Sequence, residues 1–166
     1  MLELKYKALL AKAENQKFQN LENIRICFEV LVLSAAINRD CALRLGKYEL
    51  SEAKFGLLFL LRDQPNGLAP HTLAEQAGVS RATITGLLDG LEQSGLLVRY
   101  ADTEDRRKLT VRLTEQGRVI AQASFNEHTQ WISTLLSDFN DAEKQIFSKL
   151  LHKIWLKTDD AKGIQA

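Results

Sequence analysis

Two clusters of polar side chains in this 166-residue sequence have types and spacings suited to binding a polyanion. The first, Ser80, Arg81, Thr83 and Thr85, stands at the start of a segment with helical periodicity. Hydroxyls and the free amides of a helix N-terminus can donate to phosphates or base edges, and an arginine there can reach a guanine edge or a phosphate. The second cluster, DTEDRR at 102–107, lies between two alternating segments. If this cluster is a loop between two strands, an arginine in it could enter a narrow minor groove of DNA, where the negative potential would stabilise its charge.

The first cluster belongs to a predicted helix-turn-helix. The first helix runs from His71 to Ala77 and ends in a turn at Gly78. Ser80 caps the second helix, which Gly95 ends. The apolar positions of both helices fit one shared inner face: Leu73, Ala74, Ala77, Val79, Ile84, Leu87, Leu88 and Leu91. The polar cluster at the start of the second helix therefore points away from that face.

The second cluster belongs to a predicted hairpin of strands at 96–101 and 108–114. In the second strand Leu109, Val111 and Leu113 alternate with polar residues, so that Lys108, Thr110 and Arg112 occupy the other face. The mixed-charge segment is then the tip of a two-stranded wing. A wing that follows a helix-turn-helix at once places two contact elements on one edge, one for the major groove and one for the minor groove or the backbone.

The elements that must position this module are helices. Apolar residues at helical spacing predict an amphipathic helix within 1–20, a second helix at about 21–45 ended by a left-handed glycine, Gly46, and a core helix capped by Ser51. Thr114 caps a helix to about residue 137, and a capping box of Asn140 and Glu143 precedes a last helix to about residue 155. We expect a mainly α fold with a small β wing.

Composition excludes several classes of protein. With 45% hydrophobic residues the chain can bury one sizeable core, and a net charge of +1 excludes a grossly basic nucleic-acid coat. The N-terminus lacks the apolar core of a signal peptide, and the most apolar stretch, 26–37, is too short to span a bilayer. Two cysteines are too few for a disulfide framework. These features favour a cytoplasmic protein that does not bind membranes.

The stretch from Ser80 to Gly117, SRATITGLLDGLEQSGLLVRYADTEDRRKLTVRLTEQG, resembles the recognition helix and wing of the MarR family of winged helix-turn-helix transcription regulators. Its most specific part is Asp-x-Arg followed by apolar alternation and Leu-Thr-x-x-Gly. The residues that match this pattern are Asp105, Arg107, Leu113, Thr114 and Gly117. A looser resemblance extends from about residue 21 to 156.

The resemblance implies a domain organisation. Residues 1–20 form an N-terminal extension helix, residues 21–156 the MarR-type domain, and residues 157–166 a flexible tail. Within the domain the DNA-binding module covers about 50–115, and the dimerisation helices cover about 21–45 and 115–156. The family further implies a homodimer that binds pseudo-palindromic operators in double-stranded DNA, most often as a repressor, and that responds to a small, often aromatic effector or to oxidation.

Carried over by position, the resemblance also implies DNA contacts. Arg107 is the minor-groove or backbone contact of the wing, and Asp105 positions it, with Arg106 and Lys108 as phosphate partners. The first cluster faces the major groove. At the positions of Gly86 and Gly90, relatives often have a basic residue. Each glycine destabilises the helix by roughly 1 kcal/mol relative to alanine. Either Gly86 permits a close approach of its backbone to DNA, or this helix makes fewer side-chain contacts.

A dimer interface would bury apolar residues that are too numerous for a winged module alone to cover. They lie early and late in the chain, at Ile24, Phe28, Leu31, Leu33, Ile120, Phe125, Trp131, Leu135, Ile146, Leu150, Ile154 and Trp155. We expect about half of them to belong to the monomer core instead. The extension at 1–20 is interpreted as a brace for the dimer or a cover for a pocket.

Cys27 and Cys41 keep a redox-sensing alternative open. They lie fourteen residues apart, which is about 21 Å along a continuous helix, so they cannot bridge within one chain. Cys27, between Ile26 and Phe28, is expected to be a small buried apolar residue.

Chemistry other than binding has little support in the sequence. The three histidines, His71, His128 and His152, are scattered and have no metal-ligand spacing, and no nucleophile motif, phosphate loop or dinucleotide fingerprint occurs. We therefore expect no metal, no cofactor and no enzyme activity. A winged helix that binds protein instead of duplex remains the alternative from another functional class.

Overall fold

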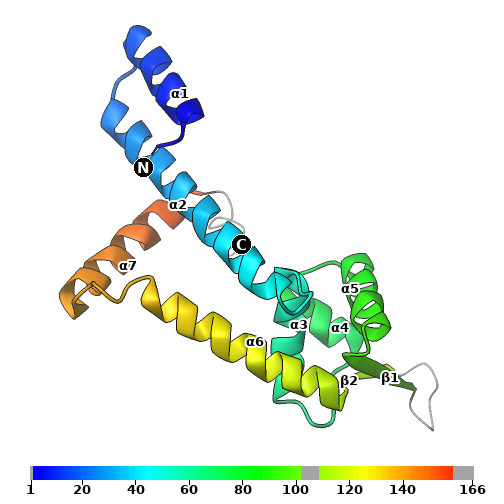
Figure 1. The fold of residues 1–166 in the computed structure, drawn as a ribbon. Helices are drawn as coiled ribbons and strands as arrows, with labels where there is room; N and C mark the ends of the chain where they lie inside the picture. Colours follow the sequence, from blue (N-terminus) through cyan, green and yellow to red (C-terminus); the bar gives the residue numbers. More distant parts are fainter. Residues whose placement is uncertain (1, 102–108, 159–166) are drawn as a thin grey trace. The chain divides into compact units, whose positions relative to one another are not determined.

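A computed structural model describes residues 2–101 and 109–158 of the chain. Figure 1 shows the order of its elements, which are α1 (Leu4–Asn15), α2 (Leu21–Gly46), α3 (Glu52–Arg62), α4 (Pro70–Ala77), α5 (Arg81–Gln93), β1 (Leu97–Ala101), β2 (Leu109–Leu113), α6 (Glu115–Thr134) and α7 (Asp141–Trp155). The chain divides into two compact units, residues 1–125 and 126–166. The mainly α fold with one small antiparallel sheet is confirmed.

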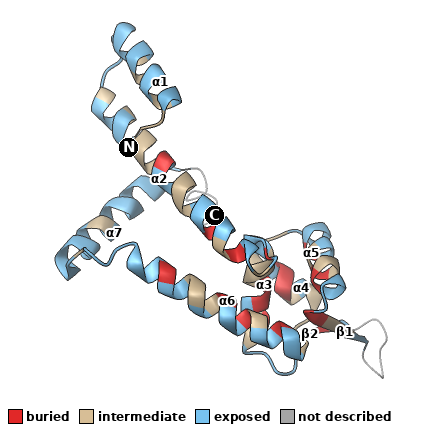
Figure 2. Cartoon of the chain, viewed as in Figure 1, coloured by how far each residue is buried: buried red, intermediate tan, exposed pale blue. Residues whose placement is uncertain are grey.

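The core of the first unit is formed by α3, α4, α5 and the sheet. Its largest fully buried side chains are leucines, and in Figure 2 the buried positions concentrate on these elements. They include Leu57, Leu58, Leu61, Leu73, Leu88, Leu91 and Leu97. Of the predicted inner face of the helix-turn-helix, Leu73, Ala74, Ile84, Leu88 and Leu91 are buried, and Ala77, Val79 and Leu87 are half-buried. Because leucines interlock from three helices, the angle between α4 and α5 is fixed by packing.

The hairpin has the predicted alternation. The register pairs Leu97 with Leu113 and Arg99 with Val111, and Val111 and Leu113 are buried while Arg112 is exposed. Leu109, predicted for the same face as Val111 and Leu113, is exposed at the start of β2. Leu68 forms an isolated antiparallel β-bridge with Val111, since their backbones exchange hydrogen bonds of 3.0 and 2.8 Å. Gly67 permits this approach: its φ is +76°, and a Cβ there would lie 2.3 Å from the carbonyl oxygen of Val111.

The predicted helix starts are confirmed by side-chain caps. Ser51 and Ser80 accept hydrogen bonds from the backbone N–H groups of Lys54 and Thr83, and Asn140 forms both bonds of a capping box with Glu143. These bonds satisfy amides that have no partner inside their helices.

Helix α2 ends differently from the prediction. Gly46 is its last helical residue, and the left-handed residue is Glu49, with φ of +57°. The N–H of Leu50 donates to the carbonyl of Leu45 and that of Glu49 to the carbonyl of Gly46, which are the two bonds of a Schellman motif. Leu45 and Leu50 are both buried. Their burial fixes the reversal at the position between them, although a glycine stands nearby.

In the second unit, residues 126–166, Trp131 is buried and α7 has no buried residue. The apolar side chains of α7 at Ile146, Leu150, Leu151 and Ile154 are exposed in the single chain. Helix α1, in the first unit, also has no buried residue and contacts α2 through the rings of Tyr6 and Phe28, whose centroids are 4.6 Å apart. In the described residues no helix is long and apolar enough to cross a membrane.

The junction between wing and α6 depends on Gly117. The hydroxyl of Thr114 donates to the carbonyl of Gly95 at 2.7 Å and accepts from the N–H of Gly117 at 2.9 Å, while the N–H of Thr114 donates to the carbonyl of Leu96 at 3.1 Å. A Cβ at position 117 would lie 1.8 Å from that Leu96 oxygen. The Leu-Thr-x-x-Gly pattern thus encodes a close approach of two backbones.

Gly117→Ala should destabilise the protein by at least about 2 kcal/mol, because the obstructing atom is backbone and cannot move aside. Chemical denaturation followed by circular dichroism would measure the change. Gly56→Ala is the control, since a Cβ at position 56 in α3 meets nothing within 4 Å, and it should be neutral or stabilise by up to about 1 kcal/mol. Equal effects of the two substitutions would contradict this account of the junction.

Candidate nucleic-acid interface

Helix α5 presents one face to solvent. Ile84, Leu88 and Leu91 are buried. Because successive residues advance by about 100° around a helix, Ala82, Gly86 and Gln93 lie opposite those three. All three opposite residues are exposed. We call Ala82 and Gly86 the pole of α5.

The predicted contact residues flank this pole. Ser80, Arg81, Thr83 and Thr85 are exposed, and Gly86 lies among them. The structure therefore brings the first cluster together on one surface. The sequence reasoning missed Ala82 and Gln93, although their helical spacing from Gly86 would have identified them.

The hydroxyls of the cluster are engaged within the helix. The oxygen of Ser80 accepts the Thr83 N–H at 3.1 Å and lies 2.8 Å from the Thr83 hydroxyl. The Thr85 hydroxyl donates to the carbonyl of Arg81 at 2.9 Å. In the free chain Thr85 can offer a ligand a lone pair and a methyl group, but its proton is committed. Arg81 has no side-chain partner in the part of the chain that the structure describes.

The predicted tip of the wing carries four of the expected contact residues. Asp105, Arg106, Arg107 and Lys108 lie outside the described residues. The strand ends on either side are defined, since the register pairs Ala101 with Leu109.

An arginine of the wing binds the recognition helix. Two nitrogens of Arg99, in β1, contact the carboxylates of Asp89 at 2.7 Å and Glu92 at 3.3 Å, both in α5. The Arg99 side chain is 24% exposed, so these ion pairs are partly shielded from water. We call this contact the Arg99 clamp. It fixes α5 relative to the hairpin, and no local sequence pattern announced it.

The two glycines of α5 differ in their surroundings. A Cβ on Gly90 would lie 3.1 Å from the Cε and Nζ of Lys54, so Gly90 makes room for a side chain from α3. A Cβ on Gly86 would meet nothing within 4 Å. Packing within the described chain therefore explains the glycine at position 90, and it does not explain the glycine at position 86.

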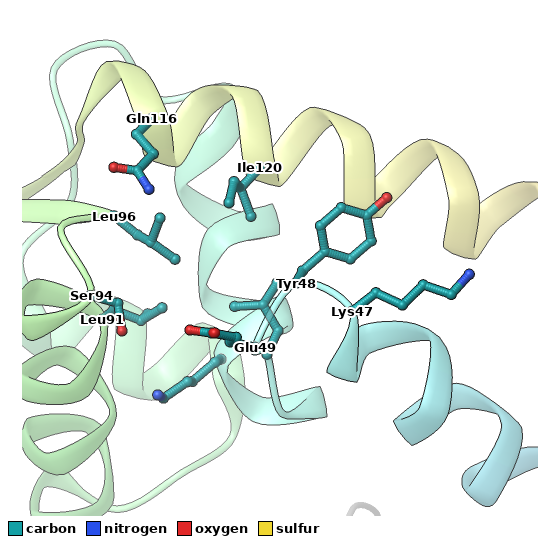
Figure 3. Close-up of a pocket in the computed structure, with 10 residues that line it drawn as sticks. Lys47, Tyr48, Glu49, Leu91, Ser94, Leu96, Gln116 and Ile120 are labelled. Carbon is teal, nitrogen blue, oxygen red and sulfur yellow. The ribbon is translucent and has the colours of Figure 1, made fainter.

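A cavity of about 300 Å³ lies where the α2–α3 turn meets the end of α5 and the start of α6. Figure 3 shows the polar side chains of Lys47, Tyr48, Glu49, Ser94 and Gln116 around it, together with apolar ones. Leu91, Leu96 and Ile120 supply the apolar surface, and Lys54 a second ammonium group. The lining thus combines apolar area with two cations and one anion.

The cysteines differ in exposure. Cys41 is buried, whereas Cys27 is exposed, so the expectation that Cys27 is buried is wrong for the single chain. Its turn of α2 places it beside other exposed positions, Ile26 and Arg25. Burial, and secondly the carboxylate of Glu52, raises the pKa of the Cys41 thiol, which reduces its reactive thiolate fraction. Both cysteines lie on one continuous helix, as the spacing argument assumed.

Among the described residues no group of histidines, cysteines and carboxylates could hold a metal ion. The rings of His128 and His152 lie against Trp131 and Trp155, with centroids 5.4 and 5.7 Å apart. Their surroundings are therefore aromatic.

A helix-turn-helix followed by an antiparallel wing defines the class of winged helix-turn-helix proteins. The sequence profile of the MarR family matches residues 50–109. The transcriptional repressor YetL of Bacillus subtilis is 34% identical over 148 residues, which cover 89% of this chain and 89% of YetL. The chain belongs to the MarR family, and it is a DNA-binding transcriptional regulator.

Solved structures share the fold. An S. aureus MepR–DNA complex superposes with a TM-score of 0.68 at 22% identity, covering 80% of this chain and 97% of that one. PcaV of Streptomyces coelicolor in complex with its natural ligand gives a TM-score of 0.59 at 23% identity, covering 75% and 90%.

Arg99→Met should lower the free energy of unfolding by about 1 kcal/mol, since it removes a partly shielded ion pair to each of two carboxylates. DNA affinity should fall with it, because α5 loses its fixed angle to the wing. Denaturation and fluorescence anisotropy with a labelled duplex would measure the two effects.

Arg25→Met is the matched control for the clamp. Arg25 pairs with Glu22 and Glu29 within α2 and is 46% exposed, so its loss should change neither quantity measurably. If both variants bound DNA equally well, the clamp would have no part in positioning α5.

Proposed function

We propose that the protein is a homodimeric, ligand-responsive transcriptional repressor that binds pseudo-palindromic operators. The observation that carries the proposal is the exposed, capped N-terminal half of α5 held by the Arg99 clamp beside the hairpin. Such a helix suits the major groove, and the residues that follow β1 then reach the neighbouring groove or backbone. The assignment as a repressor is supported by similarity to YetL.

In this proposal each contact residue has a role. Arg81 binds a guanine edge or a phosphate, and the N-terminal amides of α5 bind a phosphate. Arg107 enters the minor groove with Asp105 as its positioning partner, and Arg106 and Lys108 bind phosphates. Residues 79–118 include seven basic and six acidic side chains. Affinity must then come from the placement of a few cations and from the symmetry of the dimer.

The proposed dimer uses the exposed apolar residues of the two chain ends. In the single chain Leu31 and Leu33 of α2 are 48% and 43% exposed, and Ile146 and Leu150 of α7 are 58% and 51% exposed. Exposed apolar surface of this extent on several helices is typical of an interface. We assign residues 21–45 and 115–156 to dimerisation, about 50–115 to DNA binding, and 1–20 to an extension that braces α2.

The proposed effector site is the cavity of about 300 Å³ in Figure 3. Its size suits a small ligand, and apolar walls with two ammonium groups suit an aromatic carboxylate. The cavity joins the end of α2 to the end of α5. A ligand there would favour one setting of the DNA-binding helix over another, which is how a small molecule shifts operator affinity. PcaV, which has the same fold, has been solved with its natural ligand.

The redox alternative rests on Cys27, because the raised pKa of Cys41 disfavours that thiol as a sensor. Peroxide treatment that leaves DNA binding unchanged would exclude it. A protein-binding winged helix would show no duplex selection at all.

Selection from a pool of random duplexes should recover a palindrome with half-sites about one helical turn apart. Affinity for it should fall steeply as salt rises, and Arg107→Ala should weaken binding and flatten the salt dependence. Arg25→Ala is the control, because Arg25 of α2 pairs with Glu22 and Glu29. Recovery of no preferred sequence would overturn the proposal, and an unchanged slope in Arg107→Ala would overturn the wing assignment.

Binding of a benzoate-type acid should raise the melting temperature, with a stabilisation of about 2.7 kcal/mol at a concentration 100-fold above its Kd. It should also weaken operator binding. Lys54→Met should abolish both effects. Lys144→Met is the control and should retain them, because Lys144 pairs with Asp141 in α7 and does not line the cavity. A panel of such acids that changes neither melting temperature nor operator affinity would exclude this effector class.

A further inference from the structure

In its N-terminal half, helix α5 has no functional side chain at the centre of its outward face, and Gln93 follows on the same face only near the end of the helix. The pole consists of Ala82 and Gly86, while the hydroxyls and Arg81 stand to its sides. In a helix lying in the major groove, the centre of the outward face is nearest to the base edges. The side chains at the pole, which approach the bases most closely in this arrangement, therefore offer only C–H groups.

The glycine at the pole is not required by the fold. Gly86 has no positive φ, and a Cβ there would lie in open space. A glycine inside a helix is less favourable than alanine, so the free chain gains nothing from it. Gly90, by contrast, is explained by Lys54. Gly86 leaves free volume on the surface that faces DNA.

The chemistry of the groove limits what can fill that volume. Guanine offers two acceptors, cytosine a donor and adenine a donor and an acceptor, and an apolar pole would strip water from these groups without replacing its hydrogen bonds. The C5-methyl of thymine is the one apolar group on a base edge in the major groove. Burial of that methyl against Ala82 and Gly86 removes apolar surface from water. The methyl itself has no polar atom that would lose a partner, and the O4 acceptor of thymine lies beside it.

We propose that the pole of α5 reads an A·T base pair by packing Ala82 and Gly86 against the C5-methyl of thymine. The proposal rests on the proposed function, since it requires α5 to lie in the major groove of the operator. Specificity at this position comes from shape and from the absence of a hydrogen-bonding group. Gly86 is then a specificity-determining residue, because the absence of a Cβ leaves room for the thymine methyl. The methyl group of Thr85 adds apolar surface beside that of Ala82.

The test uses the full-length protein and its selected duplex, with each thymine of a half-site replaced in turn by deoxyuridine, which lacks only the methyl. One replacement should weaken wild-type binding about fourfold, the effect of burying one methyl group. Gly86→Ala should weaken binding to the thymine duplex by roughly tenfold, because its Cβ competes for the same volume. On the deoxyuridine duplex much of that loss should be regained.

Gly56→Ala is the matched control, because it also adds a methyl to an open helical position, in α3. Both variants should melt at or above the wild-type temperature, and only Gly86→Ala should bind DNA more weakly. The inference is overturned if no deoxyuridine replacement affects wild-type binding, or if Gly86→Ala and Gly56→Ala bind equally well. In both cases a selected duplex would still exist and the proposed function would stand. Failure to select any duplex would overturn both.

Discussion

The DNA-binding surface depends on the close contact between the backbones of Leu96 and Gly117. The carbonyl of Leu96 accepts the N–H of Thr114 and lies where a Cβ on Gly117 would be. Leu96 follows the turn that ends α5, and Gly117 stands in the first turn of α6. One contact therefore joins the recognition helix, both strands of the wing and the long helix that follows. The Arg99 clamp adds a second tie between strand and helix.

Two such ties explain how a module with little net charge can bind DNA. A surface with few cations cannot rely on the sum of many phosphate contacts, so the cations that it has must be well placed. The hydroxyls of α5 are already bonded within their own helix, and the pole has no functional side chain. In the proposed function, the placement of Arg81 and of the helix amides therefore takes the place of a dense positive surface.

Local patterns in the sequence predicted local structure well. The caps at Ser51, Ser80 and Asn140 and the two strands of the hairpin were predictable because each depends on residues close together in the chain. Gly46 shows the limit of such reasoning. A glycine near a helix end predicts a left-handed cap, but the burial of Leu45 and Leu50 sets the reversal at Glu49 instead.

Contacts between elements could not be predicted in this way. The pairing of Arg99 with Asp89 and the approach of Lys54 to Gly90 join residues on different elements. Their formation depends on packing angles that the core leucines determine. The same limit applies to Cys27, which a local apolar setting assigned to the interior and the structure leaves exposed. Of the predicted site, the α5 cluster is brought together, and the wing-tip residues 105–108 lie outside the described residues.

The central claim is that the N-terminal half of α5 and the tip of the wing contact the duplex together. Amide hydrogen exchange by mass spectrometry, with and without the selected duplex, tests it most directly, because exchange slows where DNA covers exposed amides. Exchange should slow in peptides that cover residues 80–87 and 101–109, and it should not change in peptides from α7. Unchanged exchange in both regions on a saturated duplex would contradict it.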